Sequence, residues 1–189
     1  TCSTSGRDVR QIAGSTGYWG KFPDPFDAGF RASLRRALEQ ERGKAAGDPW
    51  CIGFFAHNEL GWGDETSLAV AALASPADQP AKLAMVDDLK SKYGTVEGLN
   101  AAWGTAHASW NALLAGTTLP DKQKAGDDLK AFYTRLAEQY FRTCREEVKR
   151  AAPNQMYLGC RFAWVNDRAV KAAAEYCDVI AYNLYKRDI

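Results

Sequence analysis

The 189-residue chain lacks the features that mark several broad protein classes. No apolar run approaches the ~18 residues of a membrane-spanning segment, and the stretch from Thr1 to Gln11 is too polar for a signal peptide. The net charge is only +1, so the composition offers no strongly basic surface for nucleic acid or for an anionic membrane. We therefore expect neither of these partners, and the sequence leaves the cellular location unknown.

Metal-binding patterns are also missing. The two histidines, His57 and His107, lie far apart, and none of the five cysteines forms a CxxC pair. Structural zinc sites usually combine closely spaced Cys and His ligands. We therefore expect no metal and no cofactor, and we interpret the cysteines within apolar stretches, such as Cys144 and Cys160, as buried free thiols.

The most informative stretch runs from Trp50 to Glu65. Its apolar first half, residues 50–57, is closed by turn residues and predicts a buried strand. Asn58 and Glu59 follow directly. In parallel barrels the residues at the carboxyl ends of strands are the ones that face substrate. A Glu at this position can act as a general acid on a glycosidic oxygen, and an Asn can hydrogen-bond a sugar hydroxyl.

The rest of the chain alternates predicted helices and strands. Buried strands are expected at 50–57, 156–162 and 177–185. Amphipathic spacing and capping residues predict helices at 24–43, 68–74, 80–94, 96–103, 127–152 and 166–176. In the first of these helices we expect Asp24 as N-cap and Pro25 at the first position, and in the third we expect Leu83 to face inward. Residues 104–126 are expected to be mostly loop.

Apolar strands separated by helices imply parallel βαβ units. We therefore predict an α/β fold with one domain spanning residues 1–189, a loop-rich segment at 1–23 and a long helical insertion at 66–126 after the first recognisable strand. Three strands do not close a (β/α)8 barrel, which needs ~250 residues. The predicted fold is a partial (half) TIM barrel.

Four blocks resemble one group of enzymes in the correct order. FFAHNELGWGDE (54–65) resembles the acid/base strand of the (β/α)8-barrel glycoside hydrolase clan with an Asn-Glu motif. LKSKYGTVEGLNAAWGTAHASW (89–110) is similar to a helical insertion common in those enzymes. YLGCRFAW (157–164) and YCDVIAYNLY (176–185) resemble their fifth and sixth strands. The similarity is greatest to β-agarase-like and family 42 β-galactosidase-like enzymes, and the chain resembles a central part of the barrel.

This resemblance implies a retaining hydrolase of β-linked galactosides or related polysaccharides. Glu59 then matches the acid/base, and Asn58 matches the residue that contacts the sugar 2-hydroxyl. The family's nucleophile is a Glu on strand seven, which would follow Ile189. The alternative is a catalytically incomplete half-barrel that binds carbohydrate without turnover. An unrelated barrel hydrolase, acting on another ester or acetal, is a third reading.

Other residues near the predicted strand ends are candidates for substrate binding. Trp62 is either a sugar-stacking platform or a packed loop anchor. His57 alternates with Glu59 and is either buried and hydrogen-bonded or directed to the site. Arg161 is unusual within an apolar run, and we expect it to pair with Glu59 or to bind substrate. Tyr185 closes the third strand, where it contacts the site or packs.

Two further expectations concern carboxylates and assembly. Asp64 or Glu65 could supply a second carboxylate ~6.5–9.5 Å from Glu59, as an inverting mechanism requires. Asp178 should lie at the opposite end of its strand. The open sheet should leave an apolar inner face that includes three residues, namely Cys51, Phe55 and Cys160. A large apolar face normally marks an interface, so we expect a homodimer.

Overall fold

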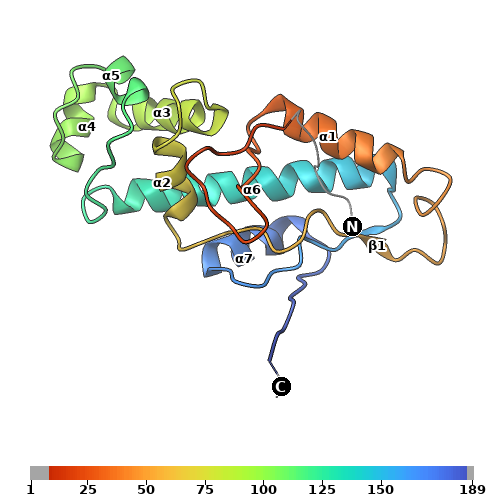
Figure 1. Ribbon diagram of the computed structural model, residues 1–189. Coiled ribbons are helices and arrows are strands. Elements are labelled where there is room, and N and C mark those ends of the chain that lie inside the picture. The colour runs from red at the N-terminus through yellow and green to blue at the C-terminus, as the bar shows by residue number, and fades with distance from the viewer. Residues whose placement is uncertain (1–8, 187–189) are drawn as a thin grey trace.

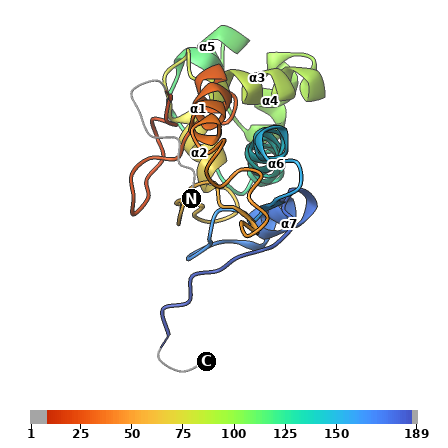
Figure 2. The ribbon, with the colours of Figure 1, turned by 90° about the vertical axis from the view of Figure 1, so that its right-hand side faces the viewer.

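A computed structural model describes residues 9–186; residues 1–8 of the loop-rich segment and 187–189 lie outside the described part. The fold is organised around one long helix, α6, which the other helices flank (Figure 1). α1 and α3 lie along one side of α6, and α7 lies along the opposite side (Figures 1 and 2). The helices are α1 (Ala28–Glu39), α2 (Ser67–Leu73), α3 (Pro80–Tyr93), α4 (Val96–Trp103), α5 (Trp110–Ala115), α6 (Gly126–Ala151) and α7 (Asp167–Tyr176).

Capping residues set several helix ends as the sequence predicts. α3 begins at Pro80 and is followed by Gly94 with φ 71°, a conformation that suits glycine. The Thr95 hydroxyl accepts a hydrogen bond from the Gly98 amide at 3.2 Å and caps α4. The Asn166 side chain accepts from the first amides of α7. The structure confirms these boundaries. Each boundary depends on residues within one helical turn, so a short stretch of sequence is enough to predict it.

Two expectations about helices are wrong. α1 begins at Ala28 with Asp27 at its N-cap, and Asp24 instead caps a different helix. The buried Asp24 carboxylate accepts from the Ala81 amide at 2.9 Å, at the start of α3. Residues 104–126 are mostly loop, as expected, with one short helix, α5, which Ser109 caps. Leu83 is 40% exposed on α3 rather than inward.

Regular strand is much shorter than expected. β1 (Gly53–Phe54) and β2 (Met156–Tyr157) form a two-stranded parallel sheet, in which Gly53 pairs with Met156 and Phe54 with Tyr157. The third expected strand contributes a single parallel bridge, between Phe162 and Tyr182. The three segments therefore lie side by side in parallel, but the structure is mostly helical.

The first two strands are short because the backbone turns within each of these two expected runs. His57, Gly159 and Arg161 have φ values of 63°, 79° and 53°, which interrupt an extended conformation. Individual hydrogen bonds still continue the pairing, for example from the Ala56 amide to the Gly159 carbonyl at 2.9 Å. Backbone hydrogen bonds thus hold the segments 50–57 and 156–162 together as far as their carboxyl ends, although neither segment is regular strand over that length.

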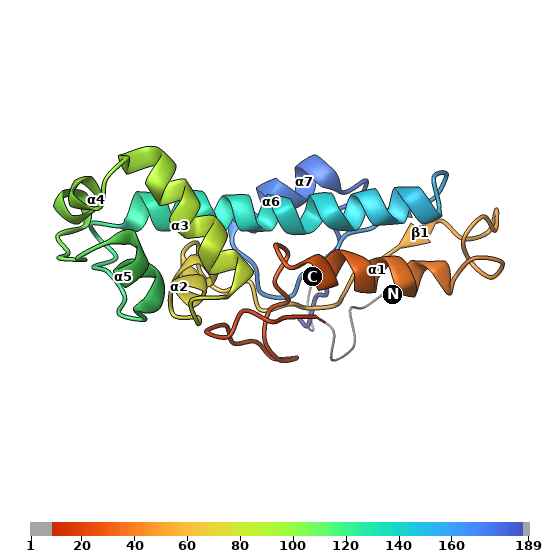
Figure 3. The same cartoon turned by 90° about the horizontal axis from the view of Figure 1, so that it is seen from above.

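Helix α1 is joined to α6 by a buried carboxylate. Glu147 is 1% exposed and accepts hydrogen bonds from Arg35 at 2.9 Å, Arg31 at 3.1 Å and Arg150 at 2.8 Å. Burial raises the pKa of Glu147, but the three guanidinium groups outweigh burial and bring it to about 2. α1 runs alongside α6 where this contact forms (Figure 3).

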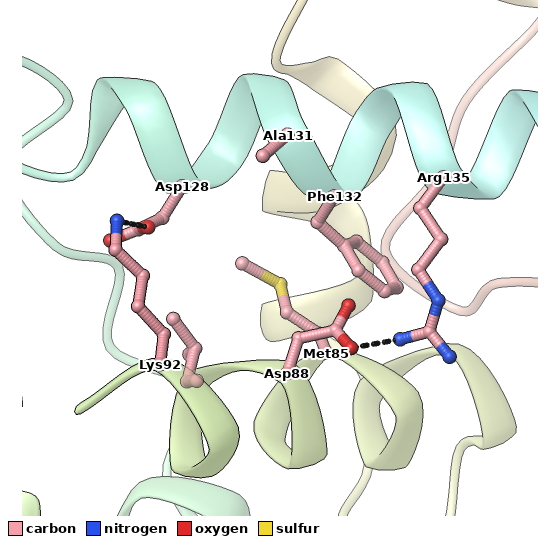
Figure 4. Close-up of a pocket in the computed structure, with 8 residues that line it drawn as sticks. Met85, Asp88, Lys92, Asp128, Ala131, Phe132 and Arg135 are labelled. Carbon is pink, nitrogen blue, oxygen red and sulfur yellow. Dashed lines mark hydrogen bonds and ion pairs between the residues drawn. The ribbon is translucent and has the colours of Figure 1, made fainter. Parts of the chain in front are cut away.

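Helices α3 and α4 are joined to α6 at its other end. A hollow of about 260 Å³ lies between α3 and α6, with ion pairs between Lys92 and Asp128 and between Arg135 and Asp88 (Figure 4). Its lining is Met85, Asp88, Leu89, Lys92, Asp128, Ala131, Phe132 and Arg135. Asp128 also accepts from the Trp103 indole at 2.7 Å, which ties α4 to the same helix.

No helix between residues 9 and 186 has both the length and the apolar character needed to cross a bilayer. Within the same range, no group of three or more His, Cys, Asp or Glu side chains is arranged to hold a metal ion.

Candidate active site

Glu59 lies just beyond the carboxyl end of β1, where the backbone is locally strained. Its amide donates to the carbonyls of Cys160 at 3.3 Å and Arg161 at 3.2 Å, so the turn is fixed to the neighbouring segment. The φ value of Glu59 is 51°, and the other described non-glycine residues with positive φ are His57 and Arg161. Such conformations are uncommon for side-chain-bearing residues and tend to cluster at functional sites.

The Glu59 carboxylate accepts hydrogen bonds on both oxygens. Oε1 accepts from the Tyr185 hydroxyl and from Asn183 Nδ2, the latter at 2.5 Å. Oε2 accepts from the Trp19 indole at 3.1 Å. Although only 7% of the residue is exposed, the aromatic donors around it are open: Trp19 is 65% exposed and Tyr185 is 70% exposed.

These donors favour the charged form of the carboxylate. The hydrogen bond from Tyr185 is the largest cause of a lowered pKa for Glu59, followed by those from Asn183 and Trp19. Arg161 adds a smaller attraction. The same contact raises the pKa of Tyr185, because losing its proton would place a second negative charge beside Glu59.

Asn183 connects Glu59 to two other expected site residues. Its Nδ2 lies 3.4 Å from Asn58 Oδ1, and its Oδ1 accepts from Arg161 Nε at 3.2 Å. The Arg161 guanidinium also lies over the Phe55 ring, 5.6 Å from the centroid. The structure therefore brings Asn58, Arg161 and Tyr185 together around Glu59, with Arg161 bonded to Asn183.

Trp62 lies in the core instead of offering a ring to a sugar. It is 0% exposed and stacks on Phe141 at 5.2 Å, with Phe22 at 4.8 Å from another side. Of the two alternatives for Trp62, the packed anchor is therefore the one observed. The sugar-stacking role is wrong for this structure because no ring face is free.

His57 is also buried rather than directed to the site. Its Nδ1 lies 2.8 Å from the Tyr140 hydroxyl, and 5% of the residue is exposed. Burial lowers the pKa of His57 to about 4. A substrate-contacting role for His57 is therefore replaced by a structural one, in which its ring stacks on Phe30.

The alternative carboxylates have other partners. Asp64 accepts from the Thr66 amide and hydroxyl, each at 2.8 Å, at the start of α2. Glu65 pairs with Arg168 at 3.2 Å. Asp178 accepts from the Tyr157 amide at 2.8 Å, at the opposite end of the sheet from Glu59. These contacts are structural, and none of them directs a second carboxylate to Glu59.

Trp19 and Asn183 contact Glu59 but are not among the site residues predicted from the sequence. Trp19 lies 40 positions before Glu59 in a loop, where periodicity carries no information about its direction. Asn183 is two residues from Tyr185, and alternation along an extended segment would have placed both side chains on the same face. That spacing is the one pattern that could have identified Asn183.

No protein-family model matches the chain. β-Agarase B of Vibrio sp. (strain JT0107) is 36% identical over an alignment of 198 residues, which covers 96% of this chain and 20% of that protein. The crystal structure of an agarase, AgWH50C, has a TM-score of 0.89 and 35% identity, and covers 98% of this chain and 28% of that one. A β-galactosidase from Halorubrum lacusprofundi, with a TM-score of 0.62 at 18% identity, shares the fold alone.

The chain spans about a fifth of the length of the curated β-agarase that it matches. Within that span, both the sequence alignment and the structural superposition cover nearly every residue of this chain. Over nearly its whole length the chain is homologous to one segment of β-agarases.

Proposed function

We propose that this chain carries the acid/base part of a glycoside hydrolase site that acts on β-linked galactose polysaccharides such as agar. The observation that supports this most directly is the Glu59 carboxylate at the end of β1, held on both oxygens by Tyr185, Asn183 and Trp19. The names of the agarase relatives indicate the substrate class. Glu59 is the residue that we assign as the general acid/base.

In the retaining reaction, Glu59 first gives its proton to the glycosidic oxygen of the leaving sugar. A second carboxylate attacks the anomeric carbon at the same time and forms a covalent glycosyl intermediate. Ionised Glu59 then takes a proton from water, which displaces that carboxylate. The two carboxyl groups must lie ~5–5.5 Å apart. By resemblance, the second one is a Glu on strand seven of the barrel.

The residues around Glu59 have complementary roles in this proposal. Asn58, which lies beside Asn183, offers a side-chain amide to the sugar 2-hydroxyl. Arg161 holds Asn183 through Oδ1 and leaves the amide hydrogens of Asn183 directed to Asn58 and Glu59. Tyr185 holds Glu59 Oε1. Each of these groups is a donor to oxygen, as recognition of hydroxyl-rich sugars requires.

The experiment compares wild type with Glu59→Gln on agar oligosaccharides and on a panel of nitrophenyl β-glycosides. We expect Glu59→Gln to lower the rate by about 10²–10⁴, because general acid–base catalysis supplies that factor. Glu65→Gln is the matched control and should retain the wild-type rate, since Glu65 pairs with Arg168. An equal rate in wild type and Glu59→Gln would contradict the proposal. Sugar binding without turnover in wild type would favour the incomplete half-barrel.

We also propose that the described segments form part of a half-barrel within a single domain, and that the 189-residue chain alone is a homodimer. Apolar side chains are exposed along both outer segments of the sheet: Trp50 is 91% exposed, Ile52 70% and Leu184 64%. Cys160, expected on the open face, is 1% exposed and belongs to the core. The proposed dimer interface therefore involves the two outer segments of the sheet more than its central segment. Sedimentation at micromolar concentration tests this, and a strictly monomeric species would contradict it.

A further inference from the structure

The loop at residues 12–23 is braced internally and anchored to the core. The Ile12 amide donates to the Phe22 carbonyl at 2.9 Å, and the Phe22 amide donates to Ser15 Oγ at 2.8 Å. Phe22 is 1% exposed and packs edge-on against Trp62. The buried Trp62 thus supports the base of this loop, and Tyr18 and Trp19 lie at its exposed end.

The same loop touches the chain immediately after Glu59. A Cβ on Gly61 would lie 2.6 Å from the Thr16 carbonyl oxygen and 2.8 Å from Gly17 Cα, so the two backbones meet where neither glycine has a side chain. Gly61 is two residues from Glu59. This contact explains how an exposed loop is held beside the carboxylate, because a side chain at Gly61 would clash with the loop backbone and push the loop away.

Trp19 meets this site with two different parts of its side chain, the indole N–H and the exposed ring. Its indole N–H donates to Glu59 Oε2 at 3.1 Å, and its ring is 65% exposed with Tyr18 in edge contact at 4.8 Å. The indole N–H is a donor only, so the contact orients the carboxylate without competing for its proton. An aromatic ring combines a large apolar face with this polar edge, and sugar rings present apolar faces of similar size.

We propose that Trp19 is a positioning residue for Glu59 and that its exposed ring forms an aromatic wall of the sugar subsite at this carboxylate. This inference rests on the function proposed above and adds a residue from a loop that precedes Glu59 by 40 positions. The stacking role expected for Trp62 falls instead to Trp19, which Trp62 supports from within the core through Phe22.

The positioning role is tested by the indole N–H resonances of ¹⁵N-labelled protein at pH 7, without any need for turnover. The chain has six tryptophans, and Trp19→Phe identifies the Trp19 resonance. We expect Glu59→Gln to shift the Trp19 resonance upfield, because an amide oxygen accepts a weaker hydrogen bond than a carboxylate. Glu65→Gln should leave it in place. An unshifted Trp19 resonance in Glu59→Gln would overturn the positioning role.

The sugar wall is tested by titrating agar oligosaccharides into three variants. Trp19→Ala should weaken binding by about tenfold, while Trp19→Phe, which keeps a ring, should weaken it less than about threefold. Trp50→Phe is the control for an exposed tryptophan outside the site. Equal affinities for wild type and Trp19→Ala would overturn the wall. If wild type binds no such sugar, the proposed function and the wall both fail, and the Trp19 resonance still decides the positioning role.

If turnover is measured, the pH dependence separates positioning from simple packing. The groups that face Glu59 are Tyr185, Asn183, Trp19 and the Arg161 cation. Removing the Trp19 N–H takes away one donor that stabilises the carboxylate, so in Trp19→Phe the alkaline limb of kcat/KM should move to higher pH. If Trp19→Phe leaves the alkaline limb of kcat/KM unchanged and lowers the free energy of unfolding, the role of Trp19 is structural and the inference is overturned.

Discussion

The Tyr185 hydroxyl donates a hydrogen bond to Oε1 of Glu59, although 126 positions separate the two residues in the sequence. This contact is the largest cause of the lowered pKa of Glu59. A general acid at neutral pH works better when its pKa is raised. The described donors have the opposite effect, because they lower the pKa of Glu59 and favour its ionised form. A second carboxylate nearby would act in the opposite direction, because like charges resist joint ionisation.

The first prediction concerns this hydrogen bond. In Tyr185→Phe the carboxylate loses its strongest donor, so the pKa of Glu59 should rise and the alkaline limb of kcat/KM should move to higher pH. The measurement is a pH–rate profile on an agar oligosaccharide. Tyr182→Phe is the matched control, since Tyr182 packs on Phe162 instead. A limb that moves equally in both variants would show that the contact with Glu59 is not the cause.

The second prediction concerns Trp62. Because it is fully buried among Phe22, Tyr140, Phe141 and Phe162, Trp62→Ala should reduce the free energy of unfolding by about 3–5 kcal/mol. Trp164→Ala removes a ring that is 71% exposed on the central segment and should change stability by less than about 0.5 kcal/mol. Urea unfolding followed by circular dichroism measures both. An unchanged free energy of unfolding in Trp62→Ala would contradict the packed role.

The third prediction concerns the buried carboxylate between α1 and α6. Glu147→Gln should cost about 1–3 kcal/mol at pH 7, because three guanidinium groups lose their charged acceptor. The pKa of Glu147 is depressed to about 2, so its stabilisation is present above the ordinary value of about 4.3 and is lost as the pH falls toward 2.

The cost of Glu147→Gln should therefore shrink between pH 5 and pH 3. Urea unfolding at several pH values tests this, and Glu146→Gln is the control. Glu146 contacts Arg31 at 47% side-chain exposure and should matter by less than about 1 kcal/mol. Equal costs for the two variants would mean that burial of Glu147 adds nothing.

The fourth prediction concerns His57. Burial lowers its pKa to about 4, whereas the unfolded chain binds the proton near pH 6.5. The folded state should therefore lose about 3 kcal/mol of stability as the pH falls from about 6.5 to about 4. His57→Gln should flatten this dependence. Thermal unfolding across the interval decides the matter, and an unchanged slope in the variant would show that another group is responsible.

Local chemistry determined most helix ends and the position of Glu59. Pro80, Thr95 and Asn166 act within one turn of the helices that they begin, so their effect is visible in a short window of sequence. The Asn58-Glu59 pair after an apolar run likewise marks a strand end without any distant contact. The expected strand lengths were wrong because positive φ values at His57 and Arg161 depend on how neighbouring segments meet.

Only the tertiary structure decided which aromatic residues are buried and which surround the carboxylate. Trp19 and Trp62 both lie in glycine-containing loops, and nothing in their local sequence distinguishes them. Trp62 is buried because Phe22, Phe141 and Phe162 converge on it from three segments far apart in the chain. Trp19 stays exposed because the close contact between the Thr16–Gly17 backbone and Gly61 leaves its ring outside, with its N–H directed at Glu59. Burial is a property of contacts between distant segments, so composition and periodicity carry too little information to assign it to one tryptophan over another.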